Sequence, residues 1–163
     1  MRTAERVFGT ASQSMGLLET AATALAMQPG HVCLVSLVDD RGGEQVLRPA
    51  CAVRRAPTVA SLPAVQQLAP DAFSRAVQRS GGALRMRLGN PRLWRLWLPP
   101  AYWAYADQVH IKAVLAAALT KHGRVVGTLL LWREGETAAA YSAADQAYVT
   151  AMATRLALAL APA

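Results

Sequence analysis

Two apolar runs that follow one another directly constrain this chain more than any other feature. Residues 111–119 and 125–132 are each of strand length, and neither alternates between apolar and polar side chains. A strand with one wet face alternates, whereas a strand covered on both faces reads as a continuous apolar run. The segment Lys121-His122-Gly123 between them is typical of a hairpin turn. The sequence therefore predicts a central antiparallel pair with packed layers on both faces of a sheet.

Regular apolar stripes predict a helix at each end of the chain. Over residues 3–27, apolar side chains recur at alternating spacings of four and three, and Pro29-Gly30 ends the pattern. Residues 143–161 repeat such a stripe after Ser142 and Asp145, which have the spacing of a capping box. The stripes consist of Ala11, Met15, Leu18, Ala22 and Leu25 in the first helix and Val149, Ala153 and Leu156 in the last. They cover either the chain's own sheet or a partner's helices, and the second alternative predicts a homodimer through the terminal helices.

Weaker signals place further elements between these helices. They indicate strands at about 31–39, 44–53 and 84–88, the central pair at 111–120 and 124–133, and short helices at 71–80 and 100–107. The Asp/Gly cluster at 39–43 predicts a hairpin turn longer than two residues. Cys33 and Cys51 then fall roughly opposite each other on adjacent strands, and we expect two buried thiols that do not bond. No repeat or boundary divides the chain, which is read as a single domain over residues 1–163.

Length, charge and apolar content indicate which cell compartment and which classes of partner to expect. The chain has 163 residues and a formal net charge of +7, and no apolar run approaches the roughly 20 residues of a membrane span. The N-terminus does not resemble a signal peptide, so we expect a cytoplasmic chain with no membrane partner. Arginines gather between residues 75 and 95, and no acid lies between Asp71 and Asp107. No helix-turn-helix, zinc or RNA-binding pattern accompanies them, and no nucleic-acid partner is predicted.

Half of the aromatic residues fall in one short segment before the central hairpin. They are Trp94, Trp97, Tyr102, Trp103 and Tyr105. Aromatic side chains combine a wide apolar surface with a polar tip, which suits the wall of a small-molecule pocket. Arg85 and Arg87 are candidates for holding an anionic group of such a ligand. The alternative, weighed about equally, is that the aromatic side chains simply fill the space.

Four motifs in the second half of the chain carry a family resemblance. They are Pro100 to Tyr105 (PAYWAY), Lys112 to Leu119 (KAVLAAAL), Gly123 to Leu129 (GRVVGTL) and Tyr141 to Asp145 (YSAAD). In this order and spacing they resemble a GAF domain of bacterial signalling proteins. Ala113 and Ala118 depart from the Ser and Pro that are usual in the penultimate strand, and both changes are small in volume.

The resemblance implies an α+β, GAF-like (PAS-related) fold. Its antiparallel sheet carries the N- and C-terminal helices packed together on one face and loops and short helices over the other, where ligands bind. The implied function is non-enzymatic: a sensory or regulatory domain that binds a small molecule or partner and passes its state through the terminal helices to an output domain. One alternative is a ligand-free dimerisation module, and a more remote one is an enzyme similar to methionine sulfoxide reductases.

Cofactor and catalytic residues are not predicted. GAF domains that bind bilins covalently use a Cys near the helix before the penultimate strand, and residues 89–110 contain none. The reductases need exposed reactive thiols in later loops, whereas this chain has only Cys33 and Cys51. The three histidines, His31, His110 and His122, are too scattered to suggest a metal cluster. His110 could be an axial haem ligand, but a lone His at a strand start is more often a surface or capping residue.

Overall fold

The computed structural model describes residues 2–55, 70–88, 90, 94–135 and 137–160, with side chains from residue 13 onward except that of Arg41. The helices are α1 (Arg2–Met27), α2 (Ala72–Ser80), α3 (Trp94–Trp97), the 3₁₀ turn η2 (Pro100–Tyr102), α4 (Trp103–Val109) and α5 (Ala143–Ala159). The strands are β1 (Val32–Arg41), β2 (Glu44–Arg54), β3 (Ala83–Arg87), β4 (Ile111–Lys121) and β5 (Arg124–Glu134). None of the described helices is long and apolar enough to cross a membrane.

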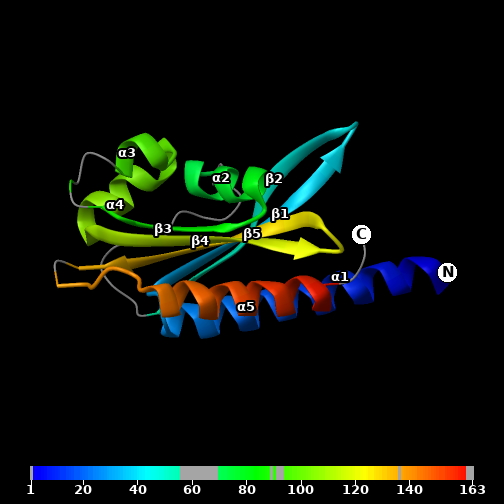
Figure 1. The fold of residues 1–163 in the computed structure, drawn as a ribbon. Helices are drawn as coiled ribbons and strands as arrows, with labels where there is room; N and C mark the ends of the chain where they lie inside the picture. The colour runs from blue at the N-terminus through cyan, green and yellow to red at the C-terminus, as the bar shows by residue number, and fades with distance from the viewer. Residues whose placement is uncertain (1, 56–69, 89, 91–93, 136, 161–163) are drawn as a thin grey trace.

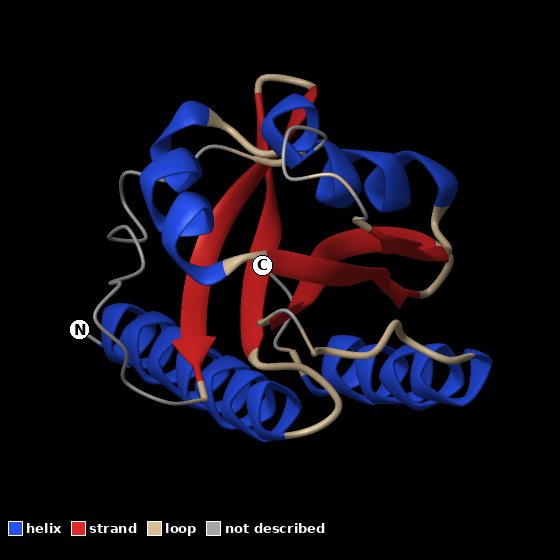
Figure 2. Cartoon of the chain, turned by 90° about the vertical axis from the view of Figure 1, so that its left-hand side faces the viewer, coloured by secondary structure: helices blue, strands red, loops and turns tan. Residues whose placement is uncertain are grey.

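The five strands form one antiparallel sheet in the order β2-β1-β5-β4-β3. The terminal helices α1 and α5 lie side by side on one face, and α2, α3 and α4 cover the other (Figures 1 and 2). We refer to these as the terminal-helix layer and the short-helix layer. The predicted α+β, GAF-like architecture is confirmed.

Each layer builds its own core against the sheet. Leu129 and Leu131 of β5 pack with the terminal helices, while Leu130 and Trp132 pack with the short helices. All four side chains are at most 1% exposed. Burial of both faces explains why the central pair reads as continuous apolar sequence.

The stripes of both terminal helices face the sheet. Leu18, Ala22 and Leu25 of α1 are fully buried in the terminal-helix core, together with Val149, Ala153 and Leu156 of α5. Met15 is half-exposed, and the side chain of Ala11 lies outside the described residues. For the six buried stripe residues, the chain's own sheet is therefore what they cover. These core side chains are therefore not available to a partner, because the sheet already covers them.

Helix ends follow the local sequence. The predicted capping box is present: the Ser142 hydroxyl accepts from the Asp145 backbone N–H, and the Asp145 carboxylate accepts from the Ser142 backbone N–H. Asp71 caps α2 through the Ser74 backbone N–H and hydroxyl, each at 2.8 Å. Burial raises the pKa of the Asp71 carboxyl.

Three details differ from the expectations from sequence. The β1–β2 turn has only two residues, because Gly42 and Gly43 adopt φ of 66° and 87° and let β1 continue to Arg41. The short helix expected at 100–107 is divided into η2 and α4, and the extra turn α3 precedes it. Cys33 and Cys51 are buried and unbonded, as expected, but they are offset: Cys33 pairs with Val53, and Cys51 with Val35.

Gly127 marks a close approach between two strands. A Cβ atom at this position would lie 2.5 Å from the Ser36 carbonyl oxygen and 3.0 Å from Leu119 Cδ1. A backbone atom cannot move aside as a flexible side chain can. This residue therefore fixes how closely β1 and β5 lie.

We therefore expect Gly127→Ala to destabilise the fold by about 1–3 kcal/mol, because β1 must shift. The control is Gly16→Ala in α1, where an added Cβ meets nothing within 4 Å and should stabilise by about 0.5–1 kcal/mol. Urea unfolding followed by circular dichroism measures both. Equal stability of the Gly127→Ala variant and the parent would contradict this account.

Candidate functional site: polar clusters at the end of strand β5

The aromatic segment forms the core of the short-helix layer. Trp94, Tyr102 and Tyr105 are buried there, while Trp97 and Trp103 are half-buried. Trp97 stacks on Phe73 with 5.0 Å between ring centroids, and Trp103 Nε1 donates to the Leu98 carbonyl at 2.9 Å. The five predicted ligand-binding aromatics therefore do come together, and in this structure they pack against the sheet and one another.

The two predicted anion-binding arginines lie elsewhere. Along β3, Ala83 packs with the terminal-helix core and Leu84 with the short-helix core. Arg85 and Arg87 therefore share the face of Ala83, and Arg85 donates to the Tyr141 carbonyl at 3.2 Å. A ligand held by the aromatic segment would not meet these guanidinium groups, because strand alternation directs them to the opposite face.

A polar cluster at the end of β5 ties α4 to the sheet. Glu134 forms an ion pair with Arg54 of β2 at 2.7 Å, and both side chains are only 11–12% exposed. The same carboxylate accepts hydrogen bonds from the Tyr105 hydroxyl and, at 3.0 Å, from Trp132 Nε1. The Arg54 guanidinium also lies over the Tyr105 ring. Burial, followed by the acceptor carboxylate of Glu134, raises the pKa of Tyr105 and keeps its proton on the hydroxyl.

His31 connects this cluster to the segment that follows α1. Its Nδ1 accepts from the Glu134 backbone N–H at 2.9 Å, which assigns the ring proton to Nε2. Burial, and then the nearby charge of Arg55, lowers the pKa of His31. The imidazole is therefore held neutral, as this acceptor role requires.

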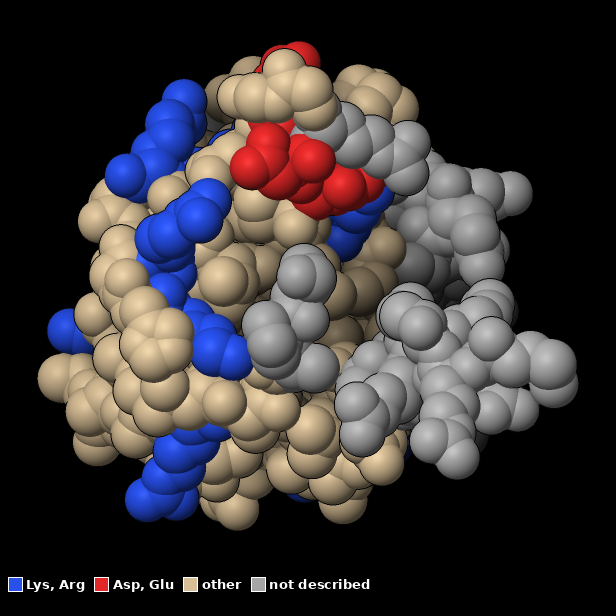
Figure 3. Space-filling model, turned by 90° about the vertical axis from the view of Figure 1, so that its right-hand side faces the viewer, with Lys and Arg blue, Asp and Glu red and all other residues tan. Residues whose placement is uncertain are grey.

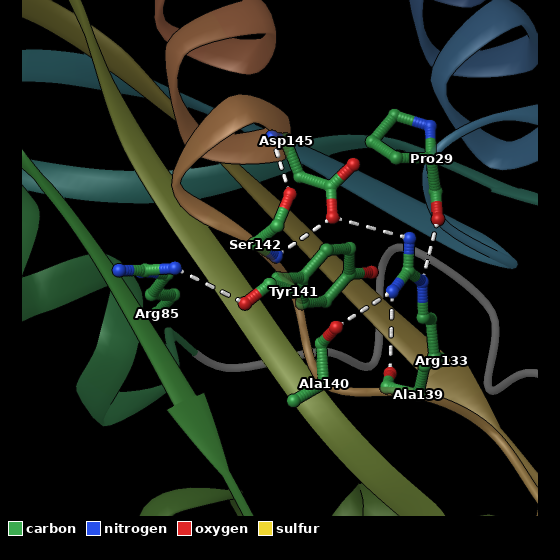
Figure 4. Close-up of polar contacts among 8 residues, drawn as sticks. All are labelled: Pro29, Arg85, Arg133, Ala139, Ala140, Tyr141, Ser142 and Asp145. Carbon is green, nitrogen blue, oxygen red and sulfur yellow. Dashed lines mark hydrogen bonds and ion pairs between the residues drawn. The ribbon is translucent and has the colours of Figure 1, made fainter.

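Arg133 organises a second cluster on the opposite face of the sheet (Figure 4). Its guanidinium donates to the Pro29 carbonyl at 2.8 Å and to the carbonyls of Ala139 and Ala140 at 3.2 and 3.0 Å. It also meets the Asp145 carboxylate at 3.4 Å and lies over the Tyr141 ring. One side chain thus holds the end of α1, the β5–α5 connection and the N-cap of α5.

Consecutive residues of β5 therefore serve opposite layers. Glu134 binds the short-helix layer through Tyr105, and Arg133 binds the start of α5 through Asp145. The hydrogen bonds from Ser142, aided by the charge of Arg133 and its hydrogen bond, lower the pKa of Asp145 and outweigh the opposing effect of burial. We call this arrangement the β5 junction. The sequence does not predict it, because Arg133 and Glu134 are simply the charged residues that follow the apolar run 125–132.

Among the described residues, neither the two thiols nor any cluster of possible metal ligands is suited to catalysis. Burial raises the pKa of Cys33, and it raises that of Cys51 to about 11, so both thiols stay protonated at neutral pH. No group of three His, Cys, Asp or Glu side chains among the described residues could hold a metal ion. His110, considered as a haem ligand, is an exposed residue with φ of 51° that caps α4.

Comparison with known proteins agrees with the architecture. The family model of the GAF domain matches residues 14–160, and the chain belongs to this family. No curated protein sequence matches significantly.

Solved structures with the same fold include the GAF domain/HD domain protein of Geobacter sulfurreducens. That protein is 19% identical, with 89% of this chain and 90% of the other covered and a TM-score of 0.64. The GAF domain of a phosphoenolpyruvate-protein phosphotransferase from Coxiella burnetii is 16% identical, with coverage of 89% and 80% and a TM-score of 0.64. A type II free methionine-R-sulfoxide reductase from Thermoplasma acidophilum is 12% identical, with coverage of 90% and 92% and a TM-score of 0.58.

The β5 junction predicts unequal effects of two acid-to-amide changes. Glu134→Gln removes the negative charge that pairs with the nearly buried Arg54 guanidinium and should cost about 2–4 kcal/mol of unfolding free energy. The matched control, Asp107→Asn, breaks the Arg95–Asp107 pair, whose side chains are 49% and 54% exposed, and should cost less than about 1 kcal/mol. Equal losses, measured by urea unfolding, would show that the β5 junction does not anchor the layer.

Proposed function

We propose that the chain is a non-enzymatic sensory or regulatory domain of a bacterial signalling protein. A small molecule or partner acts on the short-helix layer, and the terminal helices carry the resulting state to an output domain. The observation that carries this proposal is the β5 junction, since it binds both layers through neighbouring residues of one strand. Other GAF domains with this fold come from proteins described as a receptor and as an HD domain protein, which agrees with signalling.

In this proposal, a movement of the short helices is transmitted through short hydrogen bonds, which are lost if one partner moves without the other. A displacement of α4 moves the Tyr105 hydroxyl away from Glu134, and the end of β5 must follow or lose that hydrogen bond. Arg133 then changes its position relative to the carbonyl of Pro29 and the carboxylate of Asp145. Packed interfaces of this kind shift between discrete arrangements rather than deforming smoothly. The displacement therefore reaches α1 and α5, which would carry it to an output domain.

We also propose that two copies associate through the outer surface of the terminal helices. Leu18, Ala22, Leu25, Val149, Ala153 and Leu156 of the predicted stripes are buried, but other apolar side chains of the same helices face outward. Leu17 and Met27 of α1 are 42% and 52% exposed, and Tyr148 and Leu158 of α5 are 51% and 57% exposed. Residues 148, 151 and 158 are spaced by three and seven, so their side chains lie along one side of α5. A cytoplasmic location is proposed as well, in keeping with two unbonded thiols.

The dimer proposal calls for the double variant Leu17→Glu with Leu158→Glu. We expect it to remain folded and to become monomeric by light scattering, because both side chains lie outside the core. Leu18 and Leu156 would be unsuitable, since charges there disrupt the core itself. The control is Leu96→Glu on α3, a side chain that is 77% exposed and far from the terminal helices in sequence. A parent chain that is already monomeric, or a dimer that survives the double change, would refute this interface.

The structure offers no support for a methionine sulfoxide reductase activity among its described residues. One structural relative is a methionine sulfoxide reductase, but at 12% identity the likeness concerns the fold alone. Reduction of a sulfoxide by a protein thiol needs an accessible thiolate, and both Cys33 and Cys51 are buried with raised pKa values.

A further inference from the structure

The sheet separates into two hairpins at the end opposite the β5 junction. Pairing between β1 and β5 ends at Leu37 and Gly127. Beyond that point β1 continues to Arg41 paired only with β2, and β5 begins at Arg124 paired only with β4. Figure 1 shows the β1–β2 hairpin rising away from the β4–β5 hairpin. Among the described residues no strand pairing joins these parts of β1 and β5, so their edges face each other across the gap.

A groove with an apolar floor occupies this gap. It encloses about 610 Å³ and is lined by Leu37, Val38, Val125, Val126 and Leu160, together with Ser14 of α1. Its position follows from the fold, because the two hairpins diverge where α5 ends at Ala159 and Leu160 follows. Lys121 Nζ donates to the Leu160 carbonyl at 2.5 Å and holds the end of α5 at the groove.

The two walls carry opposite charges. Asp39 and Asp40 line the wall formed by the β1–β2 hairpin, and Lys121, His122 and Arg124 line the wall formed by the β4–β5 hairpin. In Figure 3, which looks onto this end of the molecule, acidic side chains gather at the top and basic side chains along the left. Asp39 is held by Arg48 at 2.8 Å, whereas Asp40, His122 and Arg124 are exposed. A partner with charges of a single sign would meet repulsion from one wall.

From these features we infer that the groove binds an extended peptide segment as an added strand. Unpaired strand edges present N–H and C=O groups, which a peptide backbone satisfies and an apolar small molecule does not. The apolar floor accepts aliphatic side chains at alternate positions of such a segment. The oppositely charged walls favour a segment that carries both a basic and an acidic residue. The volume lies within the usual range of roughly 300–1,000 Å³ for ligand sites.

This site is separate from the proposed sensory function. It lies at the opposite end of β1 and β5 from the β5 junction and uses none of the aromatic residues of the short-helix layer. A failure of either proposal therefore leaves the other standing.

The test is selection of a random heptapeptide phage library on the purified chain, followed by synthesis of the enriched peptides. We expect aliphatic residues at alternate positions and residues of both charges. Val38→Arg should weaken binding of such a peptide at least about tenfold, a change of 1.4 kcal/mol. Val38 suits this purpose because it lines the groove and belongs to neither core. The control, Met86→Arg on the edge strand β3, adds the same charge to an exposed position and should bind normally.

A second measurement separates strand addition from other modes of binding. Replacing the central residue of the peptide with proline removes a backbone N–H, and affinity should again fall at least about tenfold. Thermal unfolding of both protein variants verifies that they are folded. The inference is overturned if no peptide is enriched, if Val38→Arg binds as well as Met86→Arg, or if the proline peptide binds unchanged.

Discussion

Burial of both faces of β4 and β5 is the constraint on which the rest of the structure depends. Leu130 faces the short helices, and its neighbours Leu129 and Leu131 face the terminal helices, all without exposure. A fully buried Leu contributes roughly 1.5–3 kcal/mol, so neither layer can detach from the sheet at little cost. The sheet lies between the two layers, and its central strands are the element that both layers pack against. Any influence of one layer on the other must pass through these strands or around their ends.

The two ends of the central strands differ in the contacts that they make. At the β5 junction, Arg133 and Glu134 use charged side chains to close the sheet against both layers. At the other end, Gly127 allows β1 and β5 to approach closely once more before the hairpins separate. The first end is rich in satisfied polar contacts, whereas the second leaves strand edges and an apolar groove. This asymmetry is why we place transmission at one end and recognition of a peptide at the other.

The sequence predicted the features that depend on residues close together in the chain. Continuous apolar runs predicted the central hairpin, and Ser142 with Asp145 predicted the cap of α5. The order of the motifs indicated the GAF family. Periodicity also found the stripes of α1 and α5, but it could not tell the sheet from a partner, because a buried face looks the same in either case.

The β5 junction lay beyond this reasoning for a physical reason. Arg54 and Glu134 are 80 residues apart, and Arg133 reaches Pro29 over 104 residues, so no spacing rule joins them. The only local signal was the pair of opposite charges that ends the apolar run of β5. Likewise, the segment 94–105 was read correctly as an aromatic cluster, but its relation to Arg85 and Arg87 depended on which face each strand residue occupies.

The central claim, that the β5 junction connects the short-helix layer to the terminal helices, is tested most directly by hydrogen–deuterium exchange in a Tyr105→Phe variant. This change removes only the hydroxyl that α4 donates to Glu134. The account predicts faster exchange not only in α4 but also across the sheet, at the backbone amides of Asp145 and Gln146 in the first turn of α5. Faster exchange confined to α4 and the adjoining ends of the strands would contradict it.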